Sequence, residues 1–425
     1  MKLLEKSFSI DTSSIKFGHG ITDEVGYEIN RLGIKKALVV TDPNIINLPA
    51  GKNVIEKIYK SKTKFEVFSE VEIEPTDSSF LDAIEFSRKG NFDGFIAVGG
   101  GSTMDTAKAA NLYTKYHEDF LEYVNSPIGL GKPVPGPLNP MIAIPTTSGT
   151  GSEVSGVSIF DYKPLEAKTG IANKYLRPDI ALVDPNNILT LPKEVVACSG
   201  FDVLCHGIES FTALNFSKRE APKLPQYRPT YQGANPISDI WAIEALKIVG
   251  ENFINAVNKP EDITSRSNMM LAATYAGIGF GNAGVHLPHG MSYPVSGGVK
   301  DYKPNGYLQK KSIIPHGLSV ILNAPAVFKF TFETNPQRHI DVAKILGYNK
   351  DIDSKIPEEM LSSVLIRIIQ ATGMPNGLSS VGFGVSDIPK LIEGTLPQHR
   401  VTKLAPKEVD NNDLQNLFKE SLVLW

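Results

Sequence analysis

The first 190 residues alternate short apolar runs, rich in β-branched side chains, with longer amphipathic stretches, and this alternation is the strongest constraint on the fold. The expected strands are 37–41, 94–98, 141–145 and 180–184, and the expected helices include 78–88 and 102–113. Strands that alternate with helices form a largely parallel sheet, because each helix carries the chain back to begin the next strand in the same direction. We therefore predict an α/β domain over residues 1–190.

The pattern changes after Pro192, where β-branched runs become rare and apolar residues recur every three or four positions. Such recurrence predicts helices, for example at 237–249, 266–278 and 361–371. Pro185 and Pro192 bracket the change, because the first follows the last expected strand and the second precedes the helical region. We place a domain boundary there and predict an all-α domain over residues 191–425.

Composition excludes several classes of protein. The 425 residues carry 43 Lys and Arg against 46 Asp and Glu, a formal charge of −3, so no global basic field exists to hold nucleic acid. No stretch approaches the roughly 20 consecutive apolar residues of a membrane-spanning helix. Cys198 and Cys205 would lie about 10 Å apart along a helix, too far for a disulfide. We therefore expect an intracellular soluble protein, cytoplasmic in a bacterium or in the mitochondrial matrix of a eukaryote.

A glycine-rich turn between a strand and a helix is the first candidate ligand site. It consists of Gly99, Gly100, Gly101 and Ser102. Glycines at such a turn let backbone N–H groups approach a pyrophosphate, and the helix dipole favours its charge. The dinucleotide fingerprint G-x-G-x-x-G is not met, since Met104 stands where its last glycine belongs. Glycines that only make a tight turn would give the same pattern, and that alternative stays open.

Two further segments favour a nucleotide site. Asp42 follows the strand 37–41, where a carboxylate can accept hydrogen bonds from the adenosine ribose and repel a 2′-phosphate, which favours NAD over NADP. Residues 145–153, PTTSGTGSE, follow another expected strand and offer hydroxyls at the edge where open α/β sheets bind ligands. Taken singly, Asp42 could be a turn residue and the second segment a capping loop. Together with the glycine turn, they favour binding.

Asp202 and His206 form the strongest local signal, because residues four apart on a helix share one face. A carboxylate and an imidazole are both good ligands for a borderline divalent metal. His289 and His316 could complete a site with one coordination position open to a substrate oxygen. Spacing alone does not select this quartet, and a surface Asp–His pair with helix-capping histidines is the alternative. The isolated histidines are interpreted as structural or surface groups: His19, His117, His339 and His399.

Taken in order, these segments resemble the metal-dependent, iron-type alcohol dehydrogenase family. The matching segments are Gly99 to Ser102 with Asp105 and Lys108, PTTSGTGSE at 145–153, GFDVLCHGIES at 200–210, HGM at 289–291 and PHG at 315–317. Longer stretches resemble the branch of that family that transfers hydride between a hydroxyacid and an oxoacid. These stretches are 132–153, 169–185, 231–246, 276–297 and 394–406. The likeness covers nearly the whole chain.

The resemblance implies a dehydroquinate-synthase-like fold, with an NAD-binding α/β domain followed by a helical, metal-binding catalytic domain. It assigns a divalent metal, Fe²⁺ or Zn²⁺, to Asp202, His206, His289 and His316. It places around NAD the residues Asp42, Gly99, Gly100, Gly101, Ser102, Thr146, Thr147 and Thr150. Many family members have a second histidine four residues after the position of His289, whereas this chain has Tyr293. We expect Tyr293 among the catalytic residues, together with the four metal ligands.

The reaction implied by the resemblance is hydride transfer from 4-hydroxybutyrate to enzyme-held NAD and then to 2-oxoglutarate, giving succinate semialdehyde and D-2-hydroxyglutarate. The expected partners are small hydroxyacid and oxoacid substrates and further copies of the chain in a homo-oligomer, with no nucleic acid or membrane. The nearest alternative is an ordinary NAD-dependent alcohol or 4-hydroxybutyrate dehydrogenase that releases NADH. A lyase of the dehydroquinate-synthase type and a non-catalytic role are more distant alternatives, and the PTTSGTGSE loop argues against the lyase.

Both substrates carry carboxylates, so a cation should lie near the metal, preferably an arginine that can bind bidentately. The candidates are Arg219, Arg228, Arg400 and Lys403. Arg219 and Arg228 belong to a polar, proline-rich insertion at 215–236 that is too long for an ordinary connection between helices and suggests a lid or a substrate loop. Each of the four, taken alone, could be a solvated surface charge.

Overall fold

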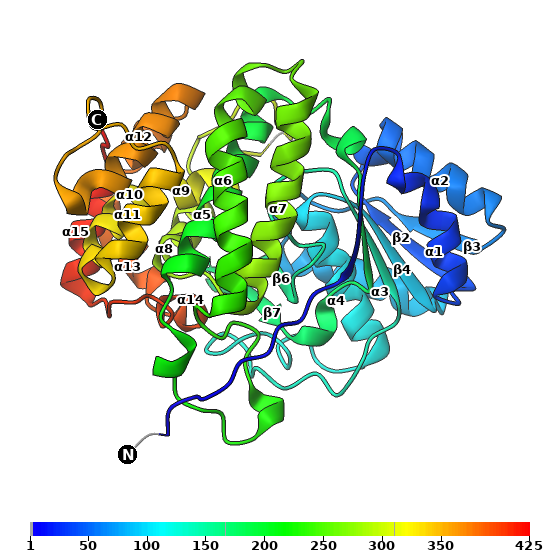
Figure 1. Cartoon of the computed structure of the whole chain (residues 1–425). Helices are drawn as coiled ribbons and strands as arrows, with labels where there is room; N and C mark the ends of the chain where they lie inside the picture. Colours follow the sequence, from blue (N-terminus) through cyan, green and yellow to red (C-terminus); the bar gives the residue numbers. More distant parts are fainter. Residues whose placement is uncertain (1–2, 166, 310) are drawn as a thin grey trace. The chain divides into compact units, whose positions relative to one another are not determined.

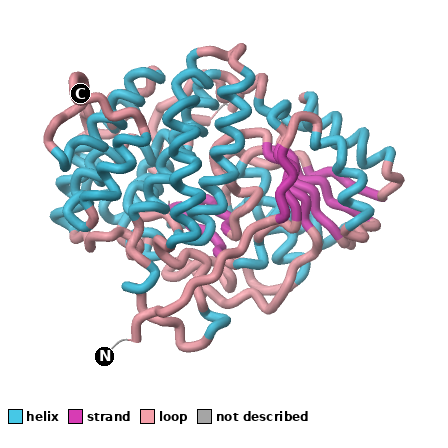
Figure 2. The backbone as a smooth tube through the Cα atoms, viewed as in Figure 1, coloured by secondary structure: helices cyan, strands magenta, loops and turns pink. Residues whose placement is uncertain are grey.

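The computed structural model describes residues 3–165, 167–309 and 311–425, and the chain divides into two compact units. The α/β unit comprises Asp11–Thr190, and the helical unit comprises Met1–Ile10 with Leu191–Trp425. Figure 2 shows the long strands gathered in the first unit and helices dominating the second. No helix in the described part of the chain combines the length and apolarity needed to cross a bilayer.

A six-stranded parallel sheet forms the centre of the α/β unit. Its strands, in spatial order, are β1 (Ser14–Phe17), β8 (Ile180–Val183), β5 (Met141–Pro145), β4 (Gly94–Gly99), β2 (Lys36–Thr41) and β3 (Lys64–Phe68). The four strands expected from sequence are confirmed as β2, β4, β5 and β8, each within one residue of its expected bounds. These are the buried inner strands, and buried parallel strands read as continuous apolar runs.

Four strands of this unit, the two edge strands and the two strands of a hairpin, were not predicted from the sequence. β1 and β3 lie at the two edges of the sheet and alternate polar with apolar residues, because one of their faces is partly exposed. β6 (Val157–Tyr162) and β7 (Ala167–Ala172) form a separate antiparallel hairpin. Neither feature gives the long apolar run that reveals an inner strand.

Helices cover both faces of the sheet, as Figure 1 shows. On one face lie α1 (Val25–Arg31) and α2 (Pro49–Lys60), and on the other lie α3 (Asp77–Gly90) and α4 (Gly101–Lys115). The period of two along β2 divides its side chains between them: Val39 packs with α1 and α2, while Leu38 and Val40 pack with α3 and α4. The unit is therefore a three-layer α/β/α fold.

The second unit is built from helices around one apolar core. They are α5 (Lys193–Thr212), α6 (Pro236–Asn258), α7 (Ile263–Ala283), α8 (Leu287–Gly297), α9 (His316–Ile321), α10 (Ala324–Thr331), α11 (Pro336–Ile345), α12 (Met360–Thr372), α13 (Ile388–Thr395), α14 (His399–Thr402) and α15 (Asn411–Ser421). α5 is buried over most of its length, and its buried residues include polar ones, among them Asp202, His206 and Glu209. α6, α7 and α12 confirm the helices predicted from periodicity.

The insertion at 215–236 pairs with the beginning of the chain. Leu4 and Glu220 form an isolated antiparallel bridge. The backbone N–H of Glu5 donates to the carbonyl of Arg219 at 2.9 Å, and the backbone N–H of Ala221 donates to the carbonyl of Leu3 at 2.8 Å. These bonds explain why the first ten residues belong to the helical unit.

Candidate metal and nucleotide sites

Three helices of the helical unit bring together the four residues predicted to bind a metal. Asp202 and His206 lie one turn apart on α5, His289 lies in the first turn of α8, and His316 begins α9. A Cβ atom added at Gly317 would lie 1.9 Å from the carbonyl oxygen of Cys198 on α5. Only glycine therefore lets α9 begin against α5, and this close approach puts His316 beside Asp202.

The ligand atoms of Asp202, His206 and His289 all lie within 4.8 Å of one another, and His316 lies close to the same carboxylate. Asp202 Oδ1 lies 3.4 Å from His206 Nε2, 3.6 Å from His289 Nε2 and 3.7 Å from His316 Nε2. These separations are too long for good hydrogen bonds. Within the described residues, Asp202 Oδ1 and His289 Nε2 are buried and have no hydrogen-bond partner. A carboxylate and three neighbouring imidazoles, with unpaired buried atoms on Asp202 and His289, fit a divalent metal ion.

Burial decides between this arrangement and the alternative of a surface Asp–His pair. Asp202 and His206 are 2% and 4% exposed, so they are not a surface pair. Burial lowers the pKa of His206 to about 3, which keeps the ring neutral at neutral pH. Burial alone would raise the pKa of Asp202, but the neighbouring imidazoles hold it well below its ordinary value. A neutral imidazole and an ionised carboxylate are the protonation states that bind a metal.

Glu209 contacts the candidate metal site, and the sequence analysis did not single it out. Its Oε1 lies 2.6 Å from His289 Nδ1, and its Oε2 accepts a hydrogen bond of 2.6 Å from the backbone N–H of His286. Although burial alone would lower it, Glu209 and Asp202 raise the pKa of His289 to about 10 in the metal-free protein. Because the carboxylate of Glu209 keeps a proton on Nδ1, Nε2 is the nitrogen that would release its proton to bind a metal. Glu209 lies seven residues after Asp202, on the same face of α5. That spacing was the signal available in the sequence.

Tyr293 and Arg400 adjoin the cluster. Tyr293 lies one turn after His289 on α8, and its ring centre is 6.4 Å from that of His316. Arg400 on α14 donates from Nη2 to Tyr293 Oη at 2.8 Å. The guanidinium also lies over the ring of Tyr231, 4.9 Å from its centre.

The other three predicted cations lie elsewhere in the helical unit. Arg228 pairs with Glu5 at 3.3 Å. Arg219 is paired through its backbone with the same N-terminal segment, and Lys403 is exposed. Of the four candidates, Arg400 is therefore the one that the structure places next to the predicted metal ligands.

The predicted nucleotide-binding residues lie at one edge of the α/β unit. Asp42 follows β2, the glycine turn ends β4, and the loop 146–150 follows β5. These three strands are neighbours in a parallel sheet, so their carboxyl ends meet at the edge where such sheets bind ligands. The backbone N–H of Thr146 donates to the carbonyl of Gly99 at 3.0 Å, which connects two of the segments directly.

The glycines of the turn are required by packing. None of the three has a positive φ, so the turn does not need glycine for an unusual backbone conformation. A Cβ atom added at Gly100 would lie 3.2 Å from Thr147 Cγ2, and one at Gly101 would lie 2.6 Å from Thr150 Cγ2. The glycines therefore let the 146–150 loop lie directly on the start of α4. A tight turn alone does not explain why glycines stand at these positions.

Other residues of this edge have structural roles. Asp42 Oδ1 accepts hydrogen bonds from the backbone N–H groups of Asn44 at 2.9 Å and Ile45 at 3.0 Å, so one of its oxygens does stabilise a turn. Lys108 is buried on α4 and donates to Ser152 O, Ser152 Oγ and Val157 O at 2.6–2.9 Å. These bonds fasten the 145–153 loop and β6 to α4.

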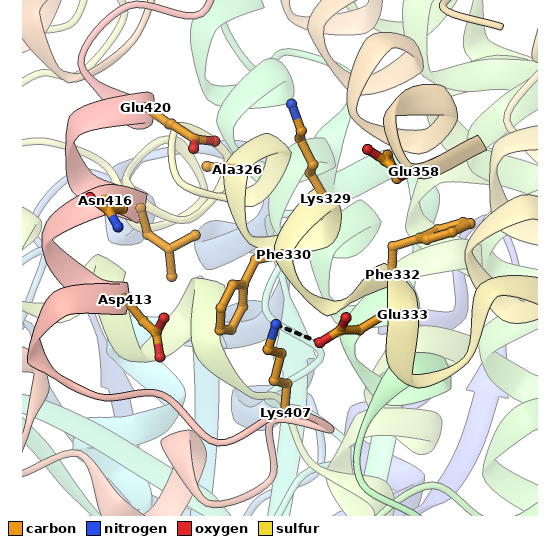
Figure 3. A pocket seen from close by; sticks show the side chains of 11 residues that line it. Ala326, Lys329, Phe330, Phe332, Glu333, Glu358, Lys407, Asp413, Asn416 and Glu420 are labelled. Carbon is orange, nitrogen blue, oxygen red and sulfur yellow. Dashed lines mark ion pairs between the residues drawn. The ribbon is translucent and has the colours of Figure 1, made fainter. Parts of the chain in front are cut away.

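A separate surface pocket of about 380 Å³ lies in the helical unit, lined in part by α10 and α15. Figure 3 shows its charged side chains around Phe330 and the ion pair of 2.6 Å between Lys407 and Glu333. Lys329, also in the lining, pairs with Glu359 at 2.9 Å. None of the residues predicted for metal, nucleotide or substrate lines this pocket.

Comparison with known families identifies the class of protein. The model described as "Iron-containing alcohol dehydrogenase" matches residues 12–185, and that described as "Fe-containing alcohol dehydrogenase family, C-terminal" matches residues 226–422. The chain belongs to the iron-containing alcohol dehydrogenase family. It is accordingly an oxidoreductase that depends on a divalent metal and on NAD.

Within that family, the chain is similar over its whole length to proteins named hydroxyacid-oxoacid transhydrogenase, mitochondrial. It is 50% identical to that of Bos taurus, with 100% of this chain and 92% of the relative covered. It is 51% identical to the probable enzyme of Dictyostelium discoideum, with 99% and 80% covered. Among solved structures, a 1,3-propanediol oxidoreductase matches with a TM-score of 0.84 at 24% identity, with 98% of this chain and 100% of that chain covered. The dehydroquinate-synthase-like fold expected from the sequence is confirmed.

Proposed function

We propose that this chain is a hydroxyacid-oxoacid transhydrogenase. It oxidises 4-hydroxybutyrate to succinate semialdehyde and passes the hydride through NAD to 2-oxoglutarate, which becomes D-2-hydroxyglutarate. The observation that carries this proposal is the identity of about one half, over the whole chain, to several proteins of that name. The clustered carboxylate and imidazoles also support it, because they could hold the divalent metal that the reaction needs.

The two units divide the chemistry between them in this proposal. We assign NAD binding to the α/β domain, through Asp42, Gly99, Gly100, Gly101, Ser102, Thr146, Thr147 and Thr150. We assign metal binding and catalysis to the domain 191–425, through Asp202, His206, His289, His316 and Tyr293. The family description favours Fe²⁺ as the resident ion, and the same donor set would accept Zn²⁺.

When bound, the metal would polarise the reacting oxygen as a Lewis acid, and NAD would carry the hydride. The residues of the chain prepare that site. Glu209 holds the proton of His289 on Nδ1, and Phe280 stacks on His206 at 3.8 Å between ring centres, which shields that ligand from water. Tyr293 Oη accepts from Arg400. Because a guanidinium can only donate, Oη acts as the acceptor in this bond, and the Tyr293 O–H group is left to donate to a substrate oxygen.

Transhydrogenation separates this proposal from the nearest alternative, an NAD-dependent dehydrogenase that releases NADH. The test is to incubate the purified, metal-loaded protein with 4-hydroxybutyrate and 2-oxoglutarate, without added NAD, and to assay 2-hydroxyglutarate. Many turnovers per subunit are expected. No turnover until NAD is added, followed by steady NADH release without any oxoacid, would refute the proposal and leave the alternative.

The same proposal includes a setting for the enzyme. The relatives carry the word mitochondrial in their names, so we place a eukaryotic form in the mitochondrial matrix and a bacterial form in the cytoplasm. We also propose that it acts as a homo-oligomer on small free acids. Light scattering of the pure protein and fractionation of the source cells test these two points.

A further inference from the structure

Within the described residues, Arg400 has no carboxylate partner. Its Nη1 atom is buried and has no hydrogen-bond partner within the described part of the chain. The groups that hold the guanidinium are the hydroxyl of Tyr293 and the side chain of Tyr231, and neither is a carboxylate. A buried guanidinium donor that lacks both a counter-ion and a hydrogen bond is costly, so an anionic ligand is the expected partner.

The surroundings of Arg400 place that anion beside the metal ligands. Tyr293, which receives the hydrogen bond from Arg400, follows His289 by one turn on α8 and lies next to His316. A Cβ atom at Gly290 would lie 2.9 Å from Thr402 Cγ2, so this glycine lets α14 pack closely on α8. The guanidinium of Arg400 on α14 is therefore held against α8, the helix that carries the predicted metal ligand His289.

We propose that Arg400 binds the substrate carboxylate, with Tyr293 and Tyr231 holding its guanidinium in place. This inference rests on the proposed function. In 4-hydroxybutyrate, two methylene groups separate the carboxylate from the carbon that is oxidised. In 2-oxoglutarate, two methylene groups separate the distal carboxylate from the carbon that is reduced. One fixed cation can therefore hold both substrates with their reacting carbons in the same place.

Arg400→Gln and Arg400→Lys test the inference against a matched control. The control is Arg367→Gln on α12, which removes an arginine that pairs with Asp353 at 3.0 Å. Succinate serves as an unreactive probe, since two methylene groups also separate its carboxylates, and calorimetry measures its affinity for the metal- and NAD-loaded protein. Loss of a charge-assisted, bidentate contact should weaken succinate binding by about 10- to 100-fold in Arg400→Gln. Arg400→Lys should weaken succinate binding less than Arg400→Gln does, because lysine keeps the positive charge but lacks the paired N–H groups of a guanidinium.

Kinetics give a second readout. The KM for 4-hydroxybutyrate should rise in parallel with the succinate dissociation constant, whereas the KM for 1-butanol should change less than about twofold, since that alcohol has no charge for the guanidinium to bind. Metal content and NAD affinity should match the control. Equal succinate affinity in wild type and both Arg400 variants would overturn the inference.

The spacing argument has its own test in the wild-type protein. Succinate should bind more tightly than malonate, with one methylene group, and than glutarate, with three. An equal affinity for the three would remove the argument that one cation serves both half-reactions. Failure of the transhydrogenase assay is distinguishable from failure of this inference, because succinate binding does not depend on whether NADH is released.

Discussion

Replacing Glu209 with Gln should weaken metal binding without removing a metal ligand. The carboxylate accepts from His289 Nδ1 with one oxygen and from the backbone N–H of His286 with the other, both at 2.6 Å. A Gln side chain can satisfy only one of the two, because its NH₂ group would face an N–H donor at the other position. Either orientation loosens the ring of His289 or leaves a buried donor unsatisfied.

The magnitude follows from the kind of bond that is lost. A hydrogen bond to a charged group contributes about 1.5–3 kcal/mol, which corresponds to roughly a 10- to 150-fold change in an equilibrium constant. Substitution of residues that orient metal ligands commonly lowers metal affinity by about 10- to 100-fold. We therefore expect the dissociation constant for Co²⁺, used as a spectroscopic probe in competition with a chelator, to rise by about 10- to 100-fold.

Glu244→Gln provides the control, since Glu244 lies on the surface of α6 and pairs only with Lys247 among the interactions described for it. That variant should bind Co²⁺ like the wild type. Chemical denaturation of the metal-free proteins would separate a loss of fold from a loss of affinity. A Glu209→Gln protein that unfolds normally and binds Co²⁺ within twofold of wild type would refute the orienting role of this carboxylate.

Three further outcomes are expected. Lys108→Met should destabilise the protein by about 2–4 kcal/mol in urea denaturation, because it leaves three buried acceptors unsatisfied beside Asp105; a loss under about 0.5 kcal/mol would contradict this. Gly101→Ala should raise the NAD dissociation constant by about 5- to 150-fold, since its Cβ must displace Thr150, and an unchanged constant in a fluorescence titration would show that Thr150 plays no part. Burial lowers the pKa of His286 from 6.5 to about 4, so the unfolded chain takes up a proton between these values while the folded protein does not. Stability of the metal-free protein should therefore fall by about 1.4 kcal/mol per pH unit on acidification through this window, and His286→Gln should remove that contribution; identical slopes for the two proteins would exclude it.

We could predict the inner strands of the sheet and the long helices from the sequence, because the local pattern of apolar residues reflects their burial. β1 and β3 could not, since an edge strand needs only one apolar face and its short alternation resembles that of a loop. The hairpin β6–β7 is as long as β2 or β4, but its sequences, VSIFDY and AKTGIA, place polar residues among the apolar ones. A pattern search finds strands that form a continuous apolar run and misses strands that do not.

The candidate site was only partly predictable for a related reason. Asp202 and His206 share a helix, so their spacing carries the information. That His316 reaches the same point depends on the approach of α9 to α5 at Gly317, and that Arg400 rather than Arg228 lies beside the cluster depends on how α14 packs on α8. Contacts between distant segments are set by tertiary packing, which spacing along the chain does not encode.

Whether the chain acts as a transhydrogenase or as a dehydrogenase depends on the ratio of its turnover rate to the rate at which NADH leaves. Both activities need the same metal ligands and the same NAD contacts, but a transhydrogenase must complete the second hydride transfer before NADH leaves. With an association rate of about 10⁶ M⁻¹s⁻¹ and a turnover of about 10 s⁻¹, this requires a dissociation constant below about 10 μM. On the NAD contacts proposed above, we expect the packing of the 146–150 loop on the glycine turn to lower that constant. Gly101→Ala should therefore do more than weaken NAD binding: by raising the rate of NADH release above that of turnover, it should make transhydrogenation depend on added NAD, while the metal affinity stays that of the wild type.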